Sequence, residues 1–198
     1  MTKELTHLKK DKKFAKVIVE FKLSLRKPHK RYFEALASAI IGQQISTKAA
    51  ASIRKKFVGL FSKNKFPKPE QILKKSDDAL RSAGLSFQKI SYIRSLSELV
   101  NEGEIKFNKF AKMTDGEIID VLVKVKGIGQ WTAEMFLMFC LGRPDVFSHG
   151  DLGLKNAIKK LYKINIIEHP KKYHKLVNSW SPNKTTAARY LWASLNNT

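Results

Sequence analysis

Apolar residues recur along this chain at the spacing of one helix face. From Tyr32 onward they fall at Phe33, Leu36, Ala37, Ile40 and Ile41, which is the spacing of one helix face. Similar patterns predict helices near residues 14–21, 87–100 and 184–195. Alternation of apolar and polar residues with a period of two is almost absent. The pattern therefore predicts an all-α fold.

Local start and stop signals mark the ends of further helices. Ser46 suits the N-cap of a helix that carries apolar residues as far as Leu60, and Thr114 with Glu117 matches a capping box. The helix that follows Thr114 is expected to stop at Gly127. Other helices are expected to begin near Pro69, Ser76, Gln130, Asp151 and Pro170.

A short segment with two glycines lies between two of these helices. Residues 125–133 read VKGIGQWTA, and this spacing directs Ile128 toward the core between Gly127 and Gly129. Both glycines can adopt a positive φ at little cost. Main-chain amides at the start of the next helix would then face an anion such as a phosphate, and hold DNA by its backbone without reading its sequence. An ordinary corner between two helices, without a ligand, explains the same pattern.

The charge of the chain narrows its possible partners. Its 198 residues include 38 Lys plus Arg and 17 Asp plus Glu, a formal net charge of +21. This excess favours a polyanion: DNA, RNA or an anionic membrane surface. An apolar share of 43% indicates a folded protein, large enough for one domain or two small lobes.

Other sequence features bear on location and cofactors. No apolar run reaches the roughly 18 residues that a membrane span needs, and no signal peptide is visible. We therefore expect an intracellular protein without membrane contact, in the cytoplasm and nucleoid, or in the nucleus of a eukaryote. The single cysteine, Cys140, lies in an apolar run and is expected to be buried; it allows no disulfide and no four-cysteine metal site within the chain.

Asp151 is the candidate acid, because one carboxylate that follows a turn able to hold phosphate suggests chemistry on DNA. Asp151 also precedes an apolar helix and suits an N-cap, and the two roles can coexist. Asp145 follows Pro144 in a segment expected to be a solvated loop, and is the weaker candidate.

Three segments carry a resemblance to a known family. Residues 125–133, followed by 145–154 (DVFSHGDLGL) and preceded by 41–46 (IGQQIS), closely resemble the helix-hairpin-helix DNA glycosylases. Within them, the chain is most similar to the 3-methyladenine DNA glycosylase II family, over roughly residues 30–195. The resemblance implies an all-α, two-lobed helix-hairpin-helix glycosylase fold with the active cleft between the lobes.

The resemblance also implies how the chain is organised. Residues 1–198 would form a single glycosylase unit. One lobe is expected at about 35–140, including the helix-hairpin-helix at 115–141, and the other at 1–34 with 141–198. The extra N-terminal domain of mixed structure that the family often carries is not expected.

The implied activity is that of a monofunctional DNA glycosylase of base excision repair. It would flip out alkylated purines, chiefly 3-methyladenine and also 7-methylguanine, hypoxanthine or ethenoadenine, and leave an abasic site. Asp151 matches the family's catalytic Asp, whose carboxylate would stabilise the positive charge that develops on the sugar when its bond to the base breaks, and would orient water. Relatives that also nick the strand carry a Lys nucleophile where this chain has Trp131, and because Trp forms no Schiff base, AP-lyase activity is not expected. No cofactor is required, and the cysteine count excludes an iron–sulfur cluster.

Three residues are expected to act on the flipped base and its gap. Trp131 is placed to stack on a cationic base, with a buried core aromatic as the alternative. Met135, one turn later, stands where the family often has an aromatic, and Asn183 where another aromatic is expected, so the pocket would be less aromatic and more pliable. Gln44 falls where relatives insert a side chain into the gap; a surface amide at a helix junction fits it equally well.

The hairpin itself is expected to bind DNA and an ion. The residues expected to contact DNA are Lys126, Gly127, Ile128, Gly129, Gln130 and Thr132. A monovalent cation, Na+ or K+, commonly lies in the family's hairpin on main-chain carbonyls. By motif position these carbonyls belong to Val123, Val125 and Ile128.

Three other functions remain open. A glycosylase of the same fold could act on another damaged base, and a non-catalytic helix-hairpin-helix module could bind DNA without cleaving it. A ribosomal or RNA-binding protein fits the charge but leaves the pairing of hairpin and Asp151 unexplained. The expected partner is double-stranded DNA with damaged bases, bound by a monomer.

Overall fold

The computed structural model describes residues 3–21, 23, 28–61 and 65–195. Over these residues the regular structure is helical and includes no strand, which confirms the expected all-α class. The chain divides into two compact units. We call His29–Phe136 the central unit, and Met1–Pro28 together with Leu137–Thr198 the split unit. The lobes expected at about 35–140 and at 1–34 with 141–198 stay a prediction.

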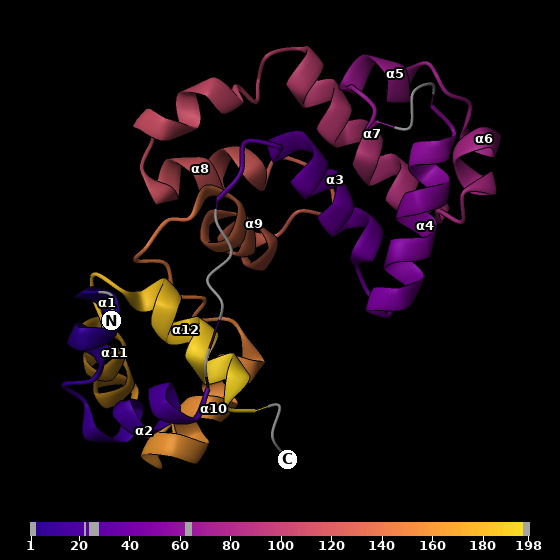
Figure 1. The fold of residues 1–198 in the computed structure, drawn as a ribbon. Coiled ribbons are helices and arrows are strands. Elements are labelled where there is room, and N and C mark those ends of the chain that lie inside the picture. Colours follow the sequence, from indigo (N-terminus) through magenta and orange to yellow (C-terminus); the bar gives the residue numbers. More distant parts are fainter. Residues whose placement is uncertain (1–2, 22, 24–27, 62–64, 196–198) are drawn as a thin grey trace. The chain divides into compact units, whose positions relative to one another are not determined.

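The central unit is organised around one long helix. Its elements are α3 (Tyr32–Gly42), α4 (Thr47–Gly59), α5 (Pro69–Leu73), α6 (Asp77–Ser82), α7 (Phe87–Asn101), the 3-10 helix η2 (Phe107–Lys112), α8 (Asp115–Leu122) and α9 (Gln130–Phe136). Helix α7 packs against α3, α5 and α6, and α3 packs in turn against α4 and α9 (Figure 1). The apolar faces of α3 and α7 are fully buried at Leu36, Ile40 and Ile93. This packing brings the end of α3, the start of α7 and α9 together.

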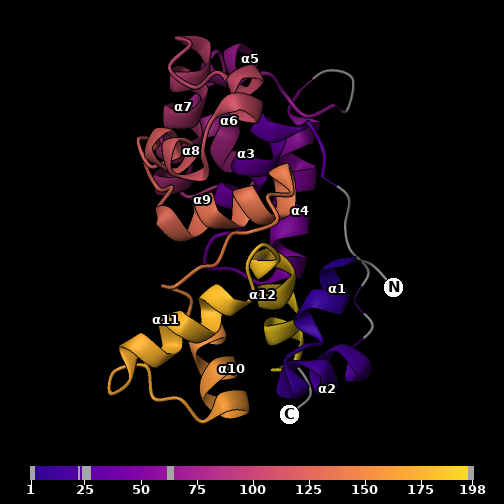
Figure 2. The ribbon, with the colours of Figure 1, turned by 90° about the vertical axis from the view of Figure 1, so that its left-hand side faces the viewer.

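The split unit joins the two ends of the described chain. Its elements are α1 (Lys3–Leu8), α2 (Lys12–Glu20), the π-helical turn η3 (Leu137–Leu141), α10 (Leu152–Tyr162), α11 (Pro170–Ser179) and α12 (Lys184–Ala193). Helix α12 packs against both α2 and α10 (Figure 2). Phe14 is buried with its ring centroid 5.4 Å from that of Trp180, and the Tyr162 hydroxyl donates to Asp11 Oδ2 at 2.6 Å. Burial and the bond to Asp11 raise the pKa of Tyr162.

Helix starts agree with the sequence signals. The hydroxyl of Ser46 accepts from Ala49 N at the start of α4, and Thr114 with Glu117 forms the expected capping box of α8. The backbone and hydroxyl of Thr114 lower the pKa of Glu117. Two short elements, α1 and η2, were not expected, because segments of six residues carry little periodicity.

The expected end of α8 is wrong. The helix ends at Leu122 instead of Gly127, and residues 123–129 form successive tight turns. Val125 and Ile128 are both buried in these turns, with Ile128 N donating to Val125 O at 3.0 Å. A spacing of three residues places both side chains inward in a tight turn as well as in a helix, so periodicity does not distinguish a tight turn from a helix.

Among the described residues, no helix has the length and apolar character needed to cross a bilayer.

Arg94 on α7 should be a main support of the central unit. Its guanidinium donates twice to Asp77 Oδ1, at 2.9 and 2.6 Å, and also to the carbonyls of Lys75 and Leu73, at 2.6 and 3.2 Å. We expect Arg94→Lys to lower the free energy of unfolding by about 1–2 kcal/mol, because an ammonium group does not reproduce the planar arrangement of donors in the guanidinium. Urea denaturation measures the change.

The exposed Arg81 provides the matched control for Arg94. Its guanidinium lies over the ring of Phe87 at 4.1 Å, a contact that Lys can also make. Arg81→Lys should change the free energy of unfolding by less than about 0.5 kcal/mol. Equal effects of the two substitutions would contradict a special role for Arg94.

Candidate functional site

The turn between α8 and α9 contains a position that only glycine fits. Gly127 has φ +80, in the left-handed region that L side chains rarely adopt. A Cβ at residue 127 would also overlap the ring of Tyr92. Gly129 differs: its φ is not positive, and a Cβ there would meet nothing within 4 Å. Of the two glycines that can adopt a positive φ, only Gly127 does so, because the chain reverses with one left-handed residue.

Contacts from three directions hold the hairpin in place. Gln43 Nε2, at the end of α3, donates to Gly127 O at 2.8 Å. Lys126 N donates to Ser95 Oγ of α7 at 3.2 Å. Ile128, which is only 3% exposed, anchors the turn in the core as expected. The conformation of the turn is therefore set before any ligand binds.

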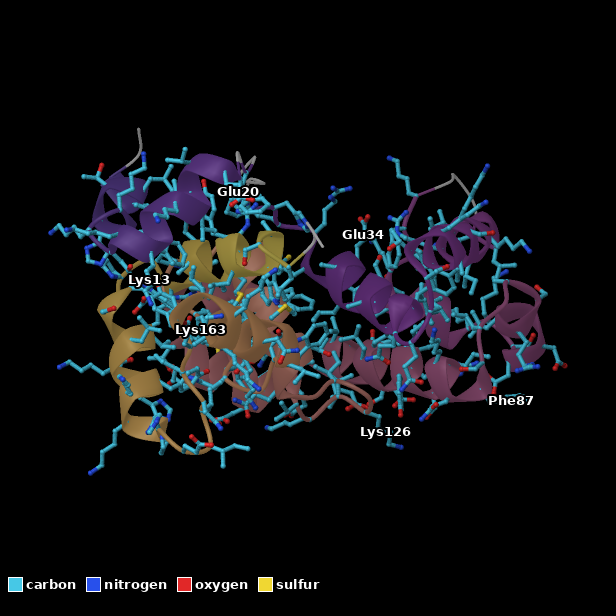
Figure 3. All side chains as sticks on the ribbon, turned by 90° about the horizontal axis from the view of Figure 1, so that it is seen from below. Lys13, Glu20, Glu34, Phe87, Lys126 and Lys163 are labelled. Atoms are coloured by element: carbon cyan, nitrogen blue, oxygen red, sulfur yellow. The ribbon has the colours of Figure 1, made fainter. Side chains whose placement is uncertain are left out.

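The outer face of the hairpin combines main chain and positive charge. Gly127 and Gly129 are both exposed, and so are Lys124, Lys126 and Gln130. The side chain of Lys126 extends away from the ribbon (Figure 3). Thr132, in the first turn of α9, is half-buried. Small residues with lysines beside them allow an anion to approach the backbone closely.

The main-chain carbonyls of Val123, Val125 and Ile128 are the ones expected to hold a monovalent cation. Val125 O accepts one hydrogen bond from Ile128 N and keeps a second lone pair. Val123 lies beyond the end of α8, and the hydrogen bonds of α9 begin with Gly129 O, so the carbonyls of Val123 and Ile128 lie outside both helices. Oxygen ligands of this kind suit a hard cation. Over the described part of the chain, no group of three or more His, Cys, Asp or Glu is arranged to hold a metal.

A cavity of about 720 Å³ lies beside the hairpin, within the central unit. Its walls include Gln44, Tyr92, Gly127, Trp131, Thr132 and Met135. The fold thus brings together the residues that the sequence analysis assigned to the flipped base and to its gap. They come from the end of α3 and from α9, which are far apart in the sequence but pack together.

Trp131 and Met135 face this cavity in different ways. Trp131 is 53% exposed, so it is not a core aromatic, and its ring is accessible from the cavity. Met135, one turn further along α9, is half-buried. An accessible indole beside a flexible thioether makes a wall that can adapt to a flat, electron-poor ring.

The two adjacent glutamines have different environments. Gln43 is half-buried and braces the hairpin through the carbonyl of Gly127. Gln44 is exposed and has φ +56, a left-handed backbone that is unusual for a residue other than glycine. Such a conformation costs on the order of 1–2 kcal/mol and turns the Gln44 side chain away from the direction a helix would give it.

Sequence reasoning missed the side chains that support the cavity. Tyr92 fills the space beside Gly127, and Gln88 Nε2 donates to its hydroxyl at 2.7 Å. Lys89 Nζ donates to Ile41 O at 2.7 Å, and burial lowers the pKa of Lys89. These residues lie on one helix with no motif of their own, so no spacing in the sequence could have identified them.

Asp151 lies in the split unit as the N-cap of α10. It is half-buried, and its Oδ1 accepts hydrogen bonds from Leu154 N at 2.8 Å and from Trp192 Nε1 at 3.0 Å. The expected capping role is therefore confirmed. Trp192 was not identified from the sequence.

Asp145 does not lie in a solvated loop, so that expectation is wrong. Its Oδ2 accepts from the Ser181 hydroxyl at 2.6 Å and lies 3.5 Å from Lys184 Nζ, while its Oδ1 accepts from Lys184 N at 3.2 Å. These contacts fix the start of α12. Both oxygens of Asp145 thus serve the fold.

His149 belongs to an aromatic cluster two residues before Asp151. Its Nδ1 lies 3.1 Å from the Tyr173 hydroxyl, and its ring packs beside those of Phe147 and His174. Burial raises the pKa of Tyr173 to about 12. The Tyr173 hydroxyl therefore keeps its proton at neutral pH.

Comparison with known proteins places these features in a family. A model described as HhH-GPD superfamily base excision DNA repair protein matches residues 37–183. The chain is 33% identical to DNA-3-methyladenine glycosylase 1 of Schizosaccharomyces pombe over 184 residues, covering 91% of this chain and 80% of that protein. It is also 34% identical to a putative DNA-3-methyladenine glycosylase of Bacillus subtilis, YfjP, over 170 residues. That match covers 82% of this chain but only 58% of the Bacillus subtilis protein.

Comparison with solved structures also finds similarity to DNA glycosylases. The chain resembles the Schizosaccharomyces pombe 3-methyladenine DNA glycosylase in complex with abasic DNA, with a TM-score of 0.82 and 30% identity, covering 98% of this chain and 97% of that one. It also resembles a DNA-3-methyladenine glycosidase from Bacillus halodurans, with a TM-score of 0.80 and 36% identity. That match covers 99% of this chain and 90% of the other.

The two hairpin glycines provide a matched pair for testing the turn. We expect Gly127→Ala to lower the free energy of unfolding by about 2 kcal/mol or more, because it adds left-handed strain and a clash with the Tyr92 ring. Gly129→Ala should change it by less than about 0.5 kcal/mol, since space is open there. Chemical denaturation measures both. Equal losses would show that the ring contact does not govern the turn.

Proposed function

Because the chain belongs to the HhH-GPD superfamily of base excision DNA repair proteins, we propose that it is a monofunctional DNA glycosylase for alkylated purines. It would hydrolyse the N-glycosidic bond of 3-methyladenine, and of 7-methylguanine, hypoxanthine or ethenoadenine, after the base is flipped out, and leave an abasic site. The observation that carries the proposal is the exposed ring of Trp131, on the wall of a cavity beside a rigid, positively charged hairpin.

The hairpin would bind the DNA backbone. Its exposed glycines and Lys126 face solvent, and the brace from Gln43 removes the need to order the turn on binding. We include in the proposal a Na+ or K+ ion held by the carbonyls of Val123, Val125 and Ile128. When bound, this ion supplies positive charge beside a phosphate. The expected complex is one protein molecule on one damaged duplex.

The cavity would receive the flipped base. A purine alkylated at N3 or N7 carries a positive charge, and an indole face attracts it more strongly than it attracts a neutral base. Trp131 supplies that face and Met135 the flexible wall below it. Gln44, exposed at the rim on a left-handed backbone, would fill the gap left in the duplex.

Asp151 would act on the sugar. As the bond from C1′ to the base nitrogen breaks, its electron pair leaves with the base, which is thereby neutralised, and positive charge develops on the sugar. The carboxylate of Asp151 stabilises that charge and accepts the proton of the water whose oxygen bonds to C1′. No Lys nucleophile stands at residue 131, so the reaction stops at the abasic site.

Replacement of Asp151 by Asn tests the assigned acid. The amide oxygen of Asn can still accept the capping hydrogen bond, so the fold should be retained. We expect Asp151→Asn to lower the single-turnover rate of 3-methyladenine release by roughly a hundredfold or more, because charge stabilisation is lost. The Kd for a duplex with an abasic-site analogue should be unchanged. Equal loss of binding and rate would instead favour a structural role or a non-catalytic DNA-binding module.

A panel of substrates tests the specificity and the absence of lyase activity. Duplexes with 3-methyladenine, 7-methylguanine, hypoxanthine or ethenoadenine are incubated with the protein, and the released base is measured. We expect free base from each and strand breaks only after alkaline treatment; breaks without alkali would contradict the monofunctional assignment. Trp131→Ala should slow release of the two cationic bases by about tenfold and of hypoxanthine less, whereas Trp131→Phe should keep most of the rate.

A further inference from the structure

We propose that a groove at the start of α3 binds a single strand of nucleic acid, at a site separate from the hairpin. A cavity of about 720 Å³, distinct from the one beside the hairpin, is lined by the first turn of α3, the last two turns of α4 and residues 65–66. A smaller cavity, of about 300 Å³, shares Arg31, Glu34 and Phe66 with it. We call the two cavities together the α3–α4 groove. All of its lining residues belong to the central unit.

Positive side chains surround the α3–α4 groove. Among the described residues that line it, six are cationic and one, Glu34, is acidic. The cations are Lys30, Arg31, Arg54, Lys55, Lys65 and Lys68. Lys68 also pairs with the exposed Glu70, at 3.9 Å. Such a concentration of one sign around a hollow attracts an anionic ligand, and a phosphate backbone supplies several negative charges in a row.

Arg54 is fixed in the wall of the α3–α4 groove. Its Nε donates to Ser38 Oγ at 3.1 Å, and its Nη2 donates to Glu34 Oε1 at 2.6 Å. Its Cζ lies 5.5 Å from the centroid of the Phe66 ring. Arg31 Nη1 donates to the same Glu34 oxygen at 3.5 Å. The one acid of the groove therefore orients two guanidinium groups, which are held in place before a ligand binds.

Aromatic rings also line the α3–α4 groove. Four of its residues are aromatic and half-buried: Tyr32, Phe33, Phe66 and Phe107. Each ring thus keeps part of its surface accessible. Unpaired bases stack on aromatic side chains whatever their identity, while cations beside the rings hold the backbone. A duplex keeps its bases stacked inside and would leave these rings unused, so cations and rings together favour a single strand.

The α3–α4 groove lies away from the hairpin. Figure 3 shows Glu34 and Lys126 on opposite sides of the central unit. Arg31 precedes the first residue of α3, whereas Gln43, which donates to Gly127 O, follows its last, and the eleven residues between them span roughly 16 Å. The groove can therefore be occupied while the hairpin is occupied. The inference goes beyond the proposed function and does not depend on it.

The central test measures binding of a fluorescent oligothymidylate of eight nucleotides by anisotropy. We expect the double variant Lys55→Gln/Lys65→Gln to raise the Kd about tenfold or more at 0.1 M salt, because two phosphate contacts are lost. The slope of log K against log salt should become shallower by about 1.4. Both lysines are exposed, so the Tm should be unchanged. A Kd within twofold of that of the unmodified protein would overturn the proposal.

Two further double variants control for charge and for the hairpin. Lys56→Gln/Lys74→Gln removes the same charge from exposed lysines outside the groove and should change the Kd by less than twofold. An equal loss in this control would show that net charge alone attracts the strand. Lys124→Gln/Lys126→Gln should also have a small effect. A larger loss there than in the groove variant would place the strand on the hairpin, and either result would overturn the proposal.

Phe66→Leu tests the aromatic part of the site. It keeps an apolar side chain but removes the ring, and should raise the Kd about fivefold or more. Phe61→Leu is the matched change, since Phe61 and Phe66 both pack against Phe57, at 5.4 and 5.8 Å between ring centroids, and Phe61 is buried. It should leave the Kd unchanged even if it lowers the Tm. Equal effects of the two substitutions would count against stacking and overturn the proposal.

Other probes identify the class of ligand. An octaglutamate peptide has a similar charge but no bases, and should bind at least tenfold more weakly than the oligothymidylate. Equal binding would overturn the proposal in favour of an acidic protein segment. An octauridylate distinguishes the two sources of a single strand: tighter binding of it than of the oligothymidylate assigns the groove to RNA, and the reverse order assigns it to DNA. None of these measurements requires base release, so failure of the proposed function and failure of this site are seen separately.

Discussion

The hairpin depends on the ring of Tyr92 occupying the space where a side chain of residue 127 would lie. This contact is available only to glycine, and it brings α7 directly against the main chain of the turn. Gln43 then holds the Gly127 carbonyl from the end of α3, across 84 positions of sequence. The outer surface of the turn is left as main chain and lysine, which is the surface that a phosphate backbone requires.

The same contacts shape the cavity. Tyr92 and Gly127 form one part of its wall, and the residues that follow the turn, Trp131 and Met135, form another. A change in the turn would therefore also move the aromatic wall. The proposed binding of the DNA backbone and the proposed recognition of the base would therefore share one support in the central unit.

In the split unit, two carboxylates six positions apart have different surroundings. Asp145 fixes the start of α12 through both oxygens, while Asp151 caps α10 and accepts a hydrogen bond from Trp192 Nε1 at its Oδ1. Each carboxylate is hydrogen-bonded, as a half-buried charged group must be.

Sequence alone determined the helical class, most helix starts, the buried Ile128 and the capping role of Asp151, because these follow from periodicity and from bonds within one turn of chain. It failed at the end of α8, which periodicity does not separate from a tight turn, and at Asp145, whose partners come from elsewhere in the fold. Tertiary structure alone placed Tyr92 against the hairpin and Trp192 on Asp151, and assembled the cavity from α3, α7 and α9. The physical reason is that a cap is satisfied by neighbours along the chain, whereas an orienting contact needs a group that only packing brings near.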